Sequence, residues 1–174
     1  MSGFILETPR LVLREFVTED AGALARCLCD PETMRFYPAP LTPGQVDEWI
    51  SRNRERCAAD GHGLWAMLLK SNGELIGDCG LTRQQVEETE EIELGYHVCR
   101  DLWGQGYASE AAAACRDWGF ERLAAGRIIS LVRVGNSPSR RVAEKSGMRL
   151  WKRVMWRNLE HWVMAVERHP SAAA

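Results

Sequence analysis

The 174-residue sequence lacks the features that mark membrane, secreted and nucleic-acid-binding proteins. No apolar run approaches the roughly 18 residues that a transmembrane helix needs. The first ten residues, MSGFILETPR, do not place a charged segment before an apolar stretch, as a secretory signal would. The net charge is only −2, so we expect no bulk attraction to nucleic acid or to an anionic membrane. These absences favour a cytoplasmic protein.

Metal-binding and cysteine chemistry also lack their usual sequence patterns. The cysteines form no Cys-x-x-Cys pair, no histidine spacing completes a zinc site, and the signatures of cysteine proteases are missing. Because most cysteines fall within apolar patterns, we expect buried free thiols in a reducing compartment, and we expect no metal. The cysteines are Cys27, Cys29, Cys57, Cys79, Cys99 and Cys115.

Two common phosphate-binding loops are absent. A nucleoside-triphosphatase loop needs G-x-x-x-x-G-K-[ST], and no lysine follows Gly104 or Gly106 in the glycine-rich turn of this chain. A dinucleotide-binding loop needs G-x-G-x-x-G, but Ser109 occupies the third glycine position.

A different strand–turn–helix pattern is present at residues 91–120, EIELGYHVCRDLWGQGYASEAAAACRDWGF. An alternating strand runs through Gly104 and Gly106 into an alanine-rich helix. The first amides of a helix have no partner within it, and the helix dipole adds partial positive charge there. Glycine has no Cβ, so the backbone can approach a ligand closely. The pattern predicts a site for a phosphate-bearing ligand.

This turn resembles the pyrophosphate loop of the GCN5-related N-acetyltransferases (GNAT), a superfamily that binds acetyl-coenzyme A. Gly106 and Ala108 match the last two fixed positions of its [Gln/Arg]-x-x-Gly-x-[Gly/Ala] pattern, whereas Trp103 departs from the first. The run WGQGYASEA, beginning at Trp103, resembles the W-G-x-G-Y-A-x-E-A run of the RimJ/RimL-like ribosomal-protein N-terminal acetyltransferases. Further matches to this branch follow in the expected order at ETPRLVLR (7–14), ELGY (93–96), NSPS (136–139) and EKSGM (144–148).

The element order predicts a mixed α/β (α+β) fold in one acetyltransferase domain over residues 1–169, followed by a disordered tail at 170–174. We expect a single twisted, mostly antiparallel sheet of about six to seven strands flanked by about four helices. The resemblance implies that the central strands splay apart. Expected strands are 5–16, 64–69, 75–81, 92–98, 128–134, 149–156 and 161–168, with 83–90 as a polar connection. Expected helix caps are Thr18, Thr42 with Gln45, and Ser137.

The resemblance also implies which residues bind the coenzyme. Backbone N–H groups around residues 104–109 would bind the pyrophosphate. The main chain of Tyr96, His97 and Val98 would contact pantetheine, as would Asn136. The bases Arg140, Arg141 and Lys145 could meet the adenosine 3′-phosphate. The loop residues expected to bind the coenzyme are Trp103, Gly104, Gln105, Gly106, Tyr107, Ala108 and Ser109.

Acetyl transfer to an amine also requires a base and an acid. Glu93 is the favoured base, because it lies on the polar face of its strand just before the coenzyme-binding segment, and His97 on the same face competes with it. Many family members use a tyrosine as the acid, but Ala143 stands at that position. Ser139 matches the serine that the RimJ/RimL-like branch is proposed to use, although it can also serve in helix capping alone, and Tyr107 is a further donor.

The expected function is that of an acetyl-CoA-dependent N-acetyltransferase acting directly on a primary amine in a ternary complex. The amine belongs to a protein N-terminus or to a small molecule, and the sequence does not choose between them. Trp49, Trp151 and Trp162 could line the acceptor side, and a homodimer is compatible with the pattern. Two alternatives remain open: a non-catalytic acyl-CoA sensor or regulatory module, and an unrelated nucleotide binder.

Overall fold

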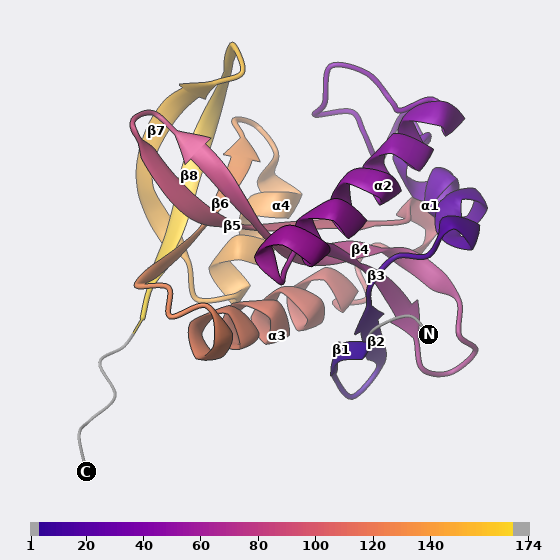
Figure 1. Cartoon of the computed structure of the whole chain (residues 1–174). Helices are drawn as coiled ribbons and strands as arrows, with labels where there is room; N and C mark the ends of the chain where they lie inside the picture. Colours follow the sequence, from indigo (N-terminus) through magenta and orange to yellow (C-terminus); the bar gives the residue numbers. More distant parts are fainter. Residues whose placement is uncertain (1–3, 169–174) are drawn as a thin grey trace.

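An eight-stranded sheet forms the centre of the molecule in the computed structural model, which describes residues 4–168 (Figure 1). The strand order is β1-β2-β3-β4-β5-β6-β8-β7, and neighbouring strands are antiparallel except for the parallel pair β5 and β6. The strands are β1 (Phe4–Glu7), β2 (Leu11–Arg14), β3 (Leu64–Leu69), β4 (Leu75–Val86), β5 (Thr89–Val98), β6 (Arg127–Arg133), β7 (Arg149–Trp156) and β8 (Leu159–Glu167). The mixed, mostly antiparallel sheet is confirmed, with slightly more strands than expected.

The additional strand arises at the start of the chain. Residues 5–16, predicted as one strand, form the antiparallel pair β1 and β2. Thr8 closes the turn between them, because its N–H donates to the Leu11 carbonyl at 2.9 Å and its hydroxyl accepts from the Leu11 N–H at 3.0 Å. Pro9 follows in the turn, where its missing N–H is not needed for a strand ladder.

The predicted polar connection at residues 83–90 is wrong. β4 continues to Val86, and β5 begins at Thr89 after a tight turn in which Glu87 has a φ of 54°. Val86 is buried in a small cluster with Ile129, Val154 and Val163. One buried side chain in a polar segment therefore anchors a hairpin whose other side chains mostly face water.

Four α-helices accompany the sheet, as expected: α1 (Ala21–Leu28), α2 (Pro43–Asp60), α3 (Tyr107–Arg122) and α4 (Ser137–Lys145). The capping box of α2 is confirmed, because the Gln45 N–H donates to Thr42 Oγ1 at 3.3 Å and Gln45 Oε1 accepts from the Thr42 N–H at 2.8 Å. Two other predicted caps are wrong.

Thr18 opens a 3₁₀ turn (Thr18–Asp20) instead of capping α1, and the Asp20 carboxylate accepts from the Val17 N–H at 2.9 Å. At α4 the cap is Asn136, whose Oδ1 accepts from the Ser139 N–H at 3.2 Å, so Ser137 already lies inside the helix. Asn136 makes the usual N-cap contact, in which the side-chain oxygen accepts from the N–H three residues later. Asp20 makes the reverse contact, from the third position of the turn back to the N–H of the capping residue.

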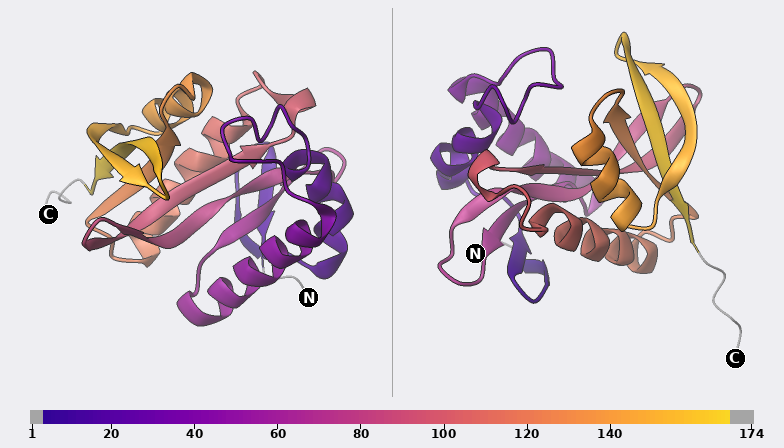
Figure 2. Two further views of the ribbon diagram at one scale, coloured as in Figure 1. Left: turned by 90° about the horizontal axis from the view of Figure 1, so that it is seen from above. Right: turned by 180° about the vertical axis from the view of Figure 1, so that it is seen from behind.

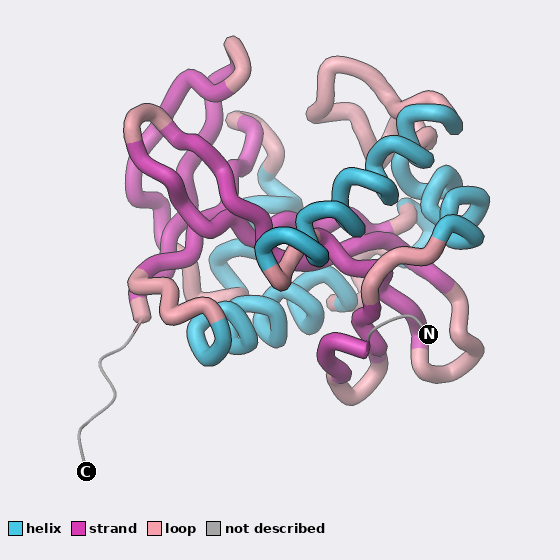
Figure 3. The backbone as a smooth tube through the Cα atoms, in the orientation of Figure 1, coloured by secondary structure: helices cyan, strands magenta, loops and turns pink. Residues whose placement is uncertain are grey.

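The helices form two layers (Figures 1 and 2). α1 and α2 cover one face of the sheet, and α3 covers the other, with α4 beside it. α3 packs close to the sheet through Ala111, Ala112 and Cys115, and a Cβ at Gly119 would come within 2.6 Å of Leu81. The small residues of this helix therefore set its distance from the strands. The long segment between α1 and α2 is an irregular loop that rises beyond the sheet (Figure 3).

The two parallel strands at the centre splay apart, as expected. β5 and β6 pair only at Ile92 with Ile128 and at Glu93 with Ile129. Just beyond, the Ser130 hydroxyl donates to the Leu94 carbonyl at 2.7 Å, in place of a continued main-chain ladder. The backbone of β5 after Leu94 is therefore left without a strand partner on its β6 side.

Other sequence expectations concern local chemistry. All six cysteines are free thiols, and all but Cys29 are buried. No helix within residues 4–168 is long and apolar enough to cross a membrane. In the same range no group of three or more His, Cys, Asp and Glu side chains is placed to hold a metal ion. The predicted tail at residues 170–174 lies outside the described residues.

Candidate active site

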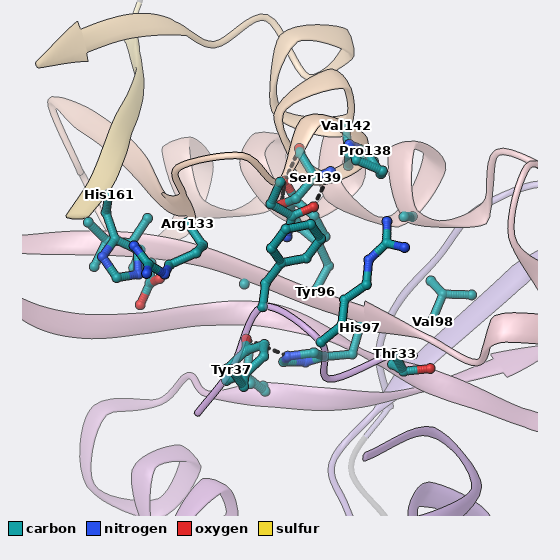
Figure 4. Close-up of a pocket in the computed structure, with 18 of the residues that line it drawn as sticks. Thr33, Tyr37, Tyr96, His97, Val98, Arg133, Pro138, Ser139, Val142 and His161 are labelled. Carbon is teal, nitrogen blue, oxygen red and sulfur yellow. Dashed lines mark hydrogen bonds between the residues drawn. The ribbon is translucent and has the colours of Figure 1, made fainter. Parts of the chain in front are cut away.

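A cavity of about 720 Å³ lies over the splayed end of β5. Its walls come from elements far apart in the sequence: the loop before α3, the start of α4, α2, the irregular loop after α1, and the β7–β8 hairpin. Figure 4 shows how β5 carries Tyr96, His97 and Val98 through this cavity, with Ser139 of α4 on one side and Tyr37 on the other. No cysteine is among its lining residues.

The loop before α3 takes the conformation that its glycines allow. Gly104 and Gly106 have φ angles of 77° and 84°, and Gly106 is the residue that precedes the first turn of α3. These positive φ angles favour glycine strongly over residues with a Cβ. A Cβ built on Gly106 would lie in van der Waals contact with Arg10 Nη2 at 3.5 Å, whereas a Cβ built on Gly104 would meet nothing within 4 Å.

Arg10 and Glu110 hold this loop in place through hydrogen bonds and an ion pair. Arg10 Nη1 donates to the Gln105 carbonyl at 2.9 Å, and Arg10 Nε donates to Glu110 at 2.6 Å. Glu110 also accepts from the Thr8 hydroxyl at 2.6 Å and from the Arg10 N–H at 2.9 Å. Burial alone would raise the pKa of Glu110, but these donors and the Arg10 charge lower it below its usual value. Gln105 is held in this clamp and does not line the cavity, unlike the other loop residues named from the sequence.

Trp103 ties the loop to the end of β5. Its indole N–H donates to the Val98 carbonyl at 2.7 Å, while 42% of the residue stays exposed. Main-chain groups of a strand point alternately to its two sides. Since Val98 and Leu94 direct their carbonyls away from β4, the main chain of Tyr96 between them also faces the gap. The His97 main chain faces β4 instead. Of the three residues expected to contact pantetheine, only Tyr96 and Val98 therefore present their main-chain groups to the gap.

The His97 side chain takes part in a buried hydrogen-bonded chain. Asp78 accepts from His97 Nδ1 at 2.7 Å and from the Trp49 indole N–H at 2.9 Å, and the Tyr37 hydroxyl lies 2.7 Å from His97 Nε2. His97 is 8% exposed and the Asp78 side chain is fully buried. Burial by itself would lower the pKa of His97, but the neighbouring Asp78 carboxylate, with a smaller contribution from Glu93, raises it overall.

Glu93 lies on the cavity wall without a basic partner at salt-bridge distance in the described part of the chain. Burial raises its pKa above the usual range. The side chain of Gln84, the main chain of Leu131 and the guanidinium groups of Arg157 and Arg56 act in the opposite direction but do not cancel this effect. A carboxylate of this kind takes up a proton more readily than an exposed one.

Tyr96 of β5 and Ser139 of α4 contact each other in the cavity (Figure 4). The Tyr96 hydroxyl donates to the Ser139 carbonyl at 2.8 Å and accepts from the Ser139 hydroxyl at 3.2 Å. Burial raises the pKa of Tyr96, which keeps the phenol protonated at neutral pH. Ala143, at the position where many family members carry a tyrosine, is fully buried. The structure thus places a phenol from β5, rather than from α4, beside Ser139.

The remaining sequence candidates divide between the cavity and the surface around it. Arg141, Lys145, Trp49 and Tyr107 line the cavity. Arg140 does not, because it pairs with Glu144 at 2.8 Å and lies over the Trp162 ring. Trp151 lies outside as well, between the side chains of Arg127 and Lys152, so of the three acceptor-side tryptophans only Trp49 is in place.

The sequence analysis missed Asp78, which contacts the lining residues His97 and Trp49, and it missed several lining residues themselves. Asp78 had a visible signal, since it is the only charged residue in the apolar strand segment LIGDCGL, where an unpaired carboxylate would be very unfavourable. Tyr37, Arg56, Trp156 and His161 come from a loop, a polar helix face and a hairpin whose positions in space the sequence does not give.

The splayed sheet and the glycine loop before α3 agree with the family resemblance seen in the sequence, and comparison with known proteins identifies the family. A family model for the acetyltransferase (GNAT) domain matches residues 10–149. The chain therefore belongs to the GNAT family and is an N-acetyltransferase of that family.

Individual relatives support this assignment. The uncharacterized protein YkkB of Bacillus subtilis (strain 168) is 39% identical over 150 residues, covering 86% of this chain and 87% of that protein. The crystal structure of an acetyltransferase from Agrobacterium tumefaciens strain C58 shares 29% identity with a TM-score of 0.82, covering 94% of each chain. RimJ from Mycobacterium smegmatis, solved with CoA-disulfide, shares the fold, with a TM-score of 0.71 and 23% identity over 90% of this chain and 81% of that one.

Proposed function

We propose that the protein binds acetyl-CoA in this cavity and moves the acetyl group directly to a primary amine in a ternary complex. The amine belongs to a protein N-terminus or to a small molecule. The observation that carries the proposal is that one cavity joins the amide-lined start of α3, the gap beside β5 and the carboxyl group of Glu93. Since no cysteine lines the cavity, transfer through a cysteine acyl-enzyme is disfavoured.

The residues present fit a coenzyme A molecule. The open space at Gly104 and the first amides of α3, which have no partner within the helix, suit a pyrophosphate. The main-chain groups of Tyr96 and Val98 face the strand gap, where an extended pantetheine arm can add hydrogen bonds as a further strand would. Arg141 and Lys145 line the cavity from α4, the helix that also carries Ser139, and suit the 3′-phosphate.

When bound, acetyl-CoA supplies an activated thioester carbon and a thiol leaving group. As the new N–C bond forms and the C–S bond breaks, Glu93 takes the proton of the attacking amine, directly or through one water. Its raised pKa makes it a stronger base than an exposed glutamate. His97 is the less suitable base, because both of its ring nitrogens are already engaged by Asp78 and Tyr37.

The departing sulfur also needs a proton. Ser139 lines the cavity, and its hydroxyl donates to the Tyr96 hydroxyl at 3.2 Å. We assign the proton donation to Ser139. The Tyr96 O–H, which donates to the Ser139 carbonyl in the resting site, then turns to the serine oxygen and restores its proton, and the phenolate regains one from water. The high pKa of Tyr96 keeps this phenol protonated between turnovers. Asn136 fixes the first turn of α4 through its bond to the Ser139 N–H and so positions the hydroxyl.

Calorimetric titration with acetyl-CoA, with ATP and NAD as controls, tests the binding step. Acetyl-CoA should bind, and the amine-dependent release of free thiol should follow. In Gly106→Val we expect at least about a tenfold loss of acetyl-CoA affinity, because a β-branched residue is strained at a φ of 84° and would shift the loop whose amides bind the pyrophosphate. Gly73→Val is the matched control, since Gly73 has a similar φ of 73° in a distant turn.

Two outcomes would overturn parts of this proposal. Equal acetyl-CoA affinity in both valine variants and in the unmodified protein would remove the pyrophosphate assignment. Binding without thiol release across amine acceptors would remove the transfer reaction and leave the acyl-CoA sensor.

A further inference from the structure

Four arginine side chains gather on the α2 side of the cavity. They are Arg52 and Arg56 of α2, Arg133 of β6 and Arg157 of the β7–β8 turn. Within residues 4–168, none of the four has a carboxylate within salt-bridge distance. Their positive charges are therefore not neutralised inside the protein.

The contacts that these arginines make orient their guanidinium groups and engage few of the N–H donors. The guanidinium of Arg157 lies 4.3 Å from the Trp156 ring, and that of Arg52 lies 5.4 Å from the Trp49 ring. Arg133 Nη1 donates to the Glu160 carbonyl at 2.8 Å. A guanidinium carries five N–H donors, so stacking or a single carbonyl contact leaves several of them free.

Arg56, like Arg157, acts electrostatically on the proposed base, Glu93. Its one side-chain contact, with Asn53 Oδ1, is long at 3.5 Å. Burial, together with repulsion from Arg52 and Arg157, lowers the pKa of Arg56, while the charge of Glu93 acts in the opposite direction. These three arginines and Glu93 therefore share one electrostatic environment, in which an additional anion would be stabilised and an additional cation would be repelled.

This cluster is separate from the proposed coenzyme phosphate site. Glu93 and Val98 are five residues apart on β5, which corresponds to about 16 Å along an extended strand. Trp103 and the glycine loop join the Val98 end, whereas Arg56 and Arg157 act on Glu93 at the other end. The pyrophosphate at the start of α3 is thus not the anion that these arginines would bind.

We propose that the acceptor is a small amine that also carries a carboxylate or phosphate group, and that Arg52, Arg56 and Arg157 bind this group while Glu93 receives the amine. This inference rests on the proposed function and specifies its substrate class. Arg35, Arg52, Arg56, Arg133 and Arg157 face only two lining carboxyl groups, Glu32 and Glu93, on this side. Polycationic acceptors such as polyamines and aminoglycosides would meet net repulsion there.

Matched amine pairs test the proposal by thiol release. Glycine is compared with glycinamide for the carboxylate, and phosphoethanolamine with ethanolamine for the phosphate, with spermidine as a polycation. We expect the anionic member of at least one pair to have a kcat/KM about tenfold or more above its neutral partner, and the pair that responds identifies the anion. In Arg56→Gln and Arg157→Gln this preference should fall by about tenfold while acetyl-CoA affinity is unchanged.

Arg54→Gln is the matched control. Arg54 lies on the same helix, is exposed, contacts Thr18 and does not line the cavity, so its loss should leave the preference intact. A second measurement does not depend on turnover: the CoA-saturated protein is titrated with inorganic phosphate. Phosphate should bind the unmodified protein and Arg54→Gln, and it should bind Arg56→Gln and Arg157→Gln at least several-fold more weakly.

The results separate the two proposals. Preferred turnover of neutral amines or spermidine, or phosphate binding that is equal in all four proteins, would overturn the anionic acceptor and leave acetyl transfer standing. Failure to bind coenzyme A, with arginine-dependent phosphate binding retained by the unliganded protein, would overturn the proposed function and leave the anion site.

Discussion

Replacing Glu93 with glutamine tests the centre of the mechanism. The change removes one negative charge and the ability to accept a proton, while it keeps the length and shape of the side chain. A glutamine can still contact Gln84 and the main chain of Leu131, so we expect the cavity to keep its form. Loss of activity in Glu93→Gln can then be assigned to chemistry rather than to packing.

The size of the effect follows from the role assigned to Glu93. A positioned general base contributes about 10²- to 10⁴-fold to the rate. This corresponds to about 2.7 to 5.4 kcal/mol in the activation free energy, at 1.36 kcal/mol for each factor of ten. We expect kcat to fall by this range at neutral pH, and the affinity for acetyl-CoA to stay the same because Glu93 lies at the far end of β5 from the glycine loop.

The pH dependence supplies a second, independent result. Only the ionised form of Glu93 accepts a proton, so the rate of the unmodified enzyme should rise with pH through a pKa above that of an ordinary glutamate, and this limb should vanish in Glu93→Gln. Burial disfavours the charged form, so folded Glu93 binds its proton more tightly than unfolded Glu93. Stability should fall as pH rises through the folded pKa, and Glu93→Gln should become relatively more stable there.

Thiol release and chemical denaturation across pH 4–9 measure both effects, with acetyl-CoA held at saturation. Glu90→Gln is the control, because Glu90 lies on the same strand, is exposed and pairs with Arg83 away from the cavity. A Glu93→Gln enzyme with an unchanged rate and an unchanged acid limb would refute the assignment of the base and make His97 the next candidate.

Three further predictions concern the support of the site. Asp78→Asn should lower the free energy of unfolding by about 1–3 kcal/mol in urea titrations, because the His97 ring loses its charged acceptor. This destabilisation should shrink as pH rises through the raised pKa of His97. Trp103→Phe removes the indole N–H that holds the Val98 carbonyl, and calorimetry should show acetyl-CoA binding about three- to tenfold weaker. Glu110→Gln should be destabilising by about 1 kcal/mol at pH 7, with the difference vanishing as pH falls through the lowered pKa of Glu110.

The parts of the site that local sequence determines were predicted well. Positive φ angles at Gly104 and Gly106 and the helix that follows are consequences of short-range sterics and capping. Alternation along β5 placed Glu93 and His97 on one face, and the structure has them there. Asn136 and Ser139 line the cavity as the family resemblance implied, and Asn136 is also the cap of α4.

The parts that depend on contacts between distant segments were not predictable in the same way. Tyr37 reaches His97 across 60 residues of sequence, from a loop whose path no periodicity describes. Alternation shows that Tyr96 faces away from His97, but it does not show that α4 will bring the Ser139 carbonyl to its hydroxyl. The β4–β5 hairpin was missed because one buried side chain, Val86, stabilises a segment that is otherwise polar.

The splay of β5 from β6 explains how one strand can serve both ends of the reaction. Side chains alternate along a strand, so Glu93 and His97 point to the α2 face while Tyr96 points to Ser139 on the α4 face. In a closed sheet, main-chain hydrogen bonds would separate these faces, and a base on one could not act on a thioester bound at the other. Because pairing of β5 with β6 ends at Glu93, the two faces are joined by the gap just beyond it. In the proposed mechanism, an amine that enters from the arginine-lined α2 face would therefore meet Glu93 first and the thioester next, in the order that the transfer requires.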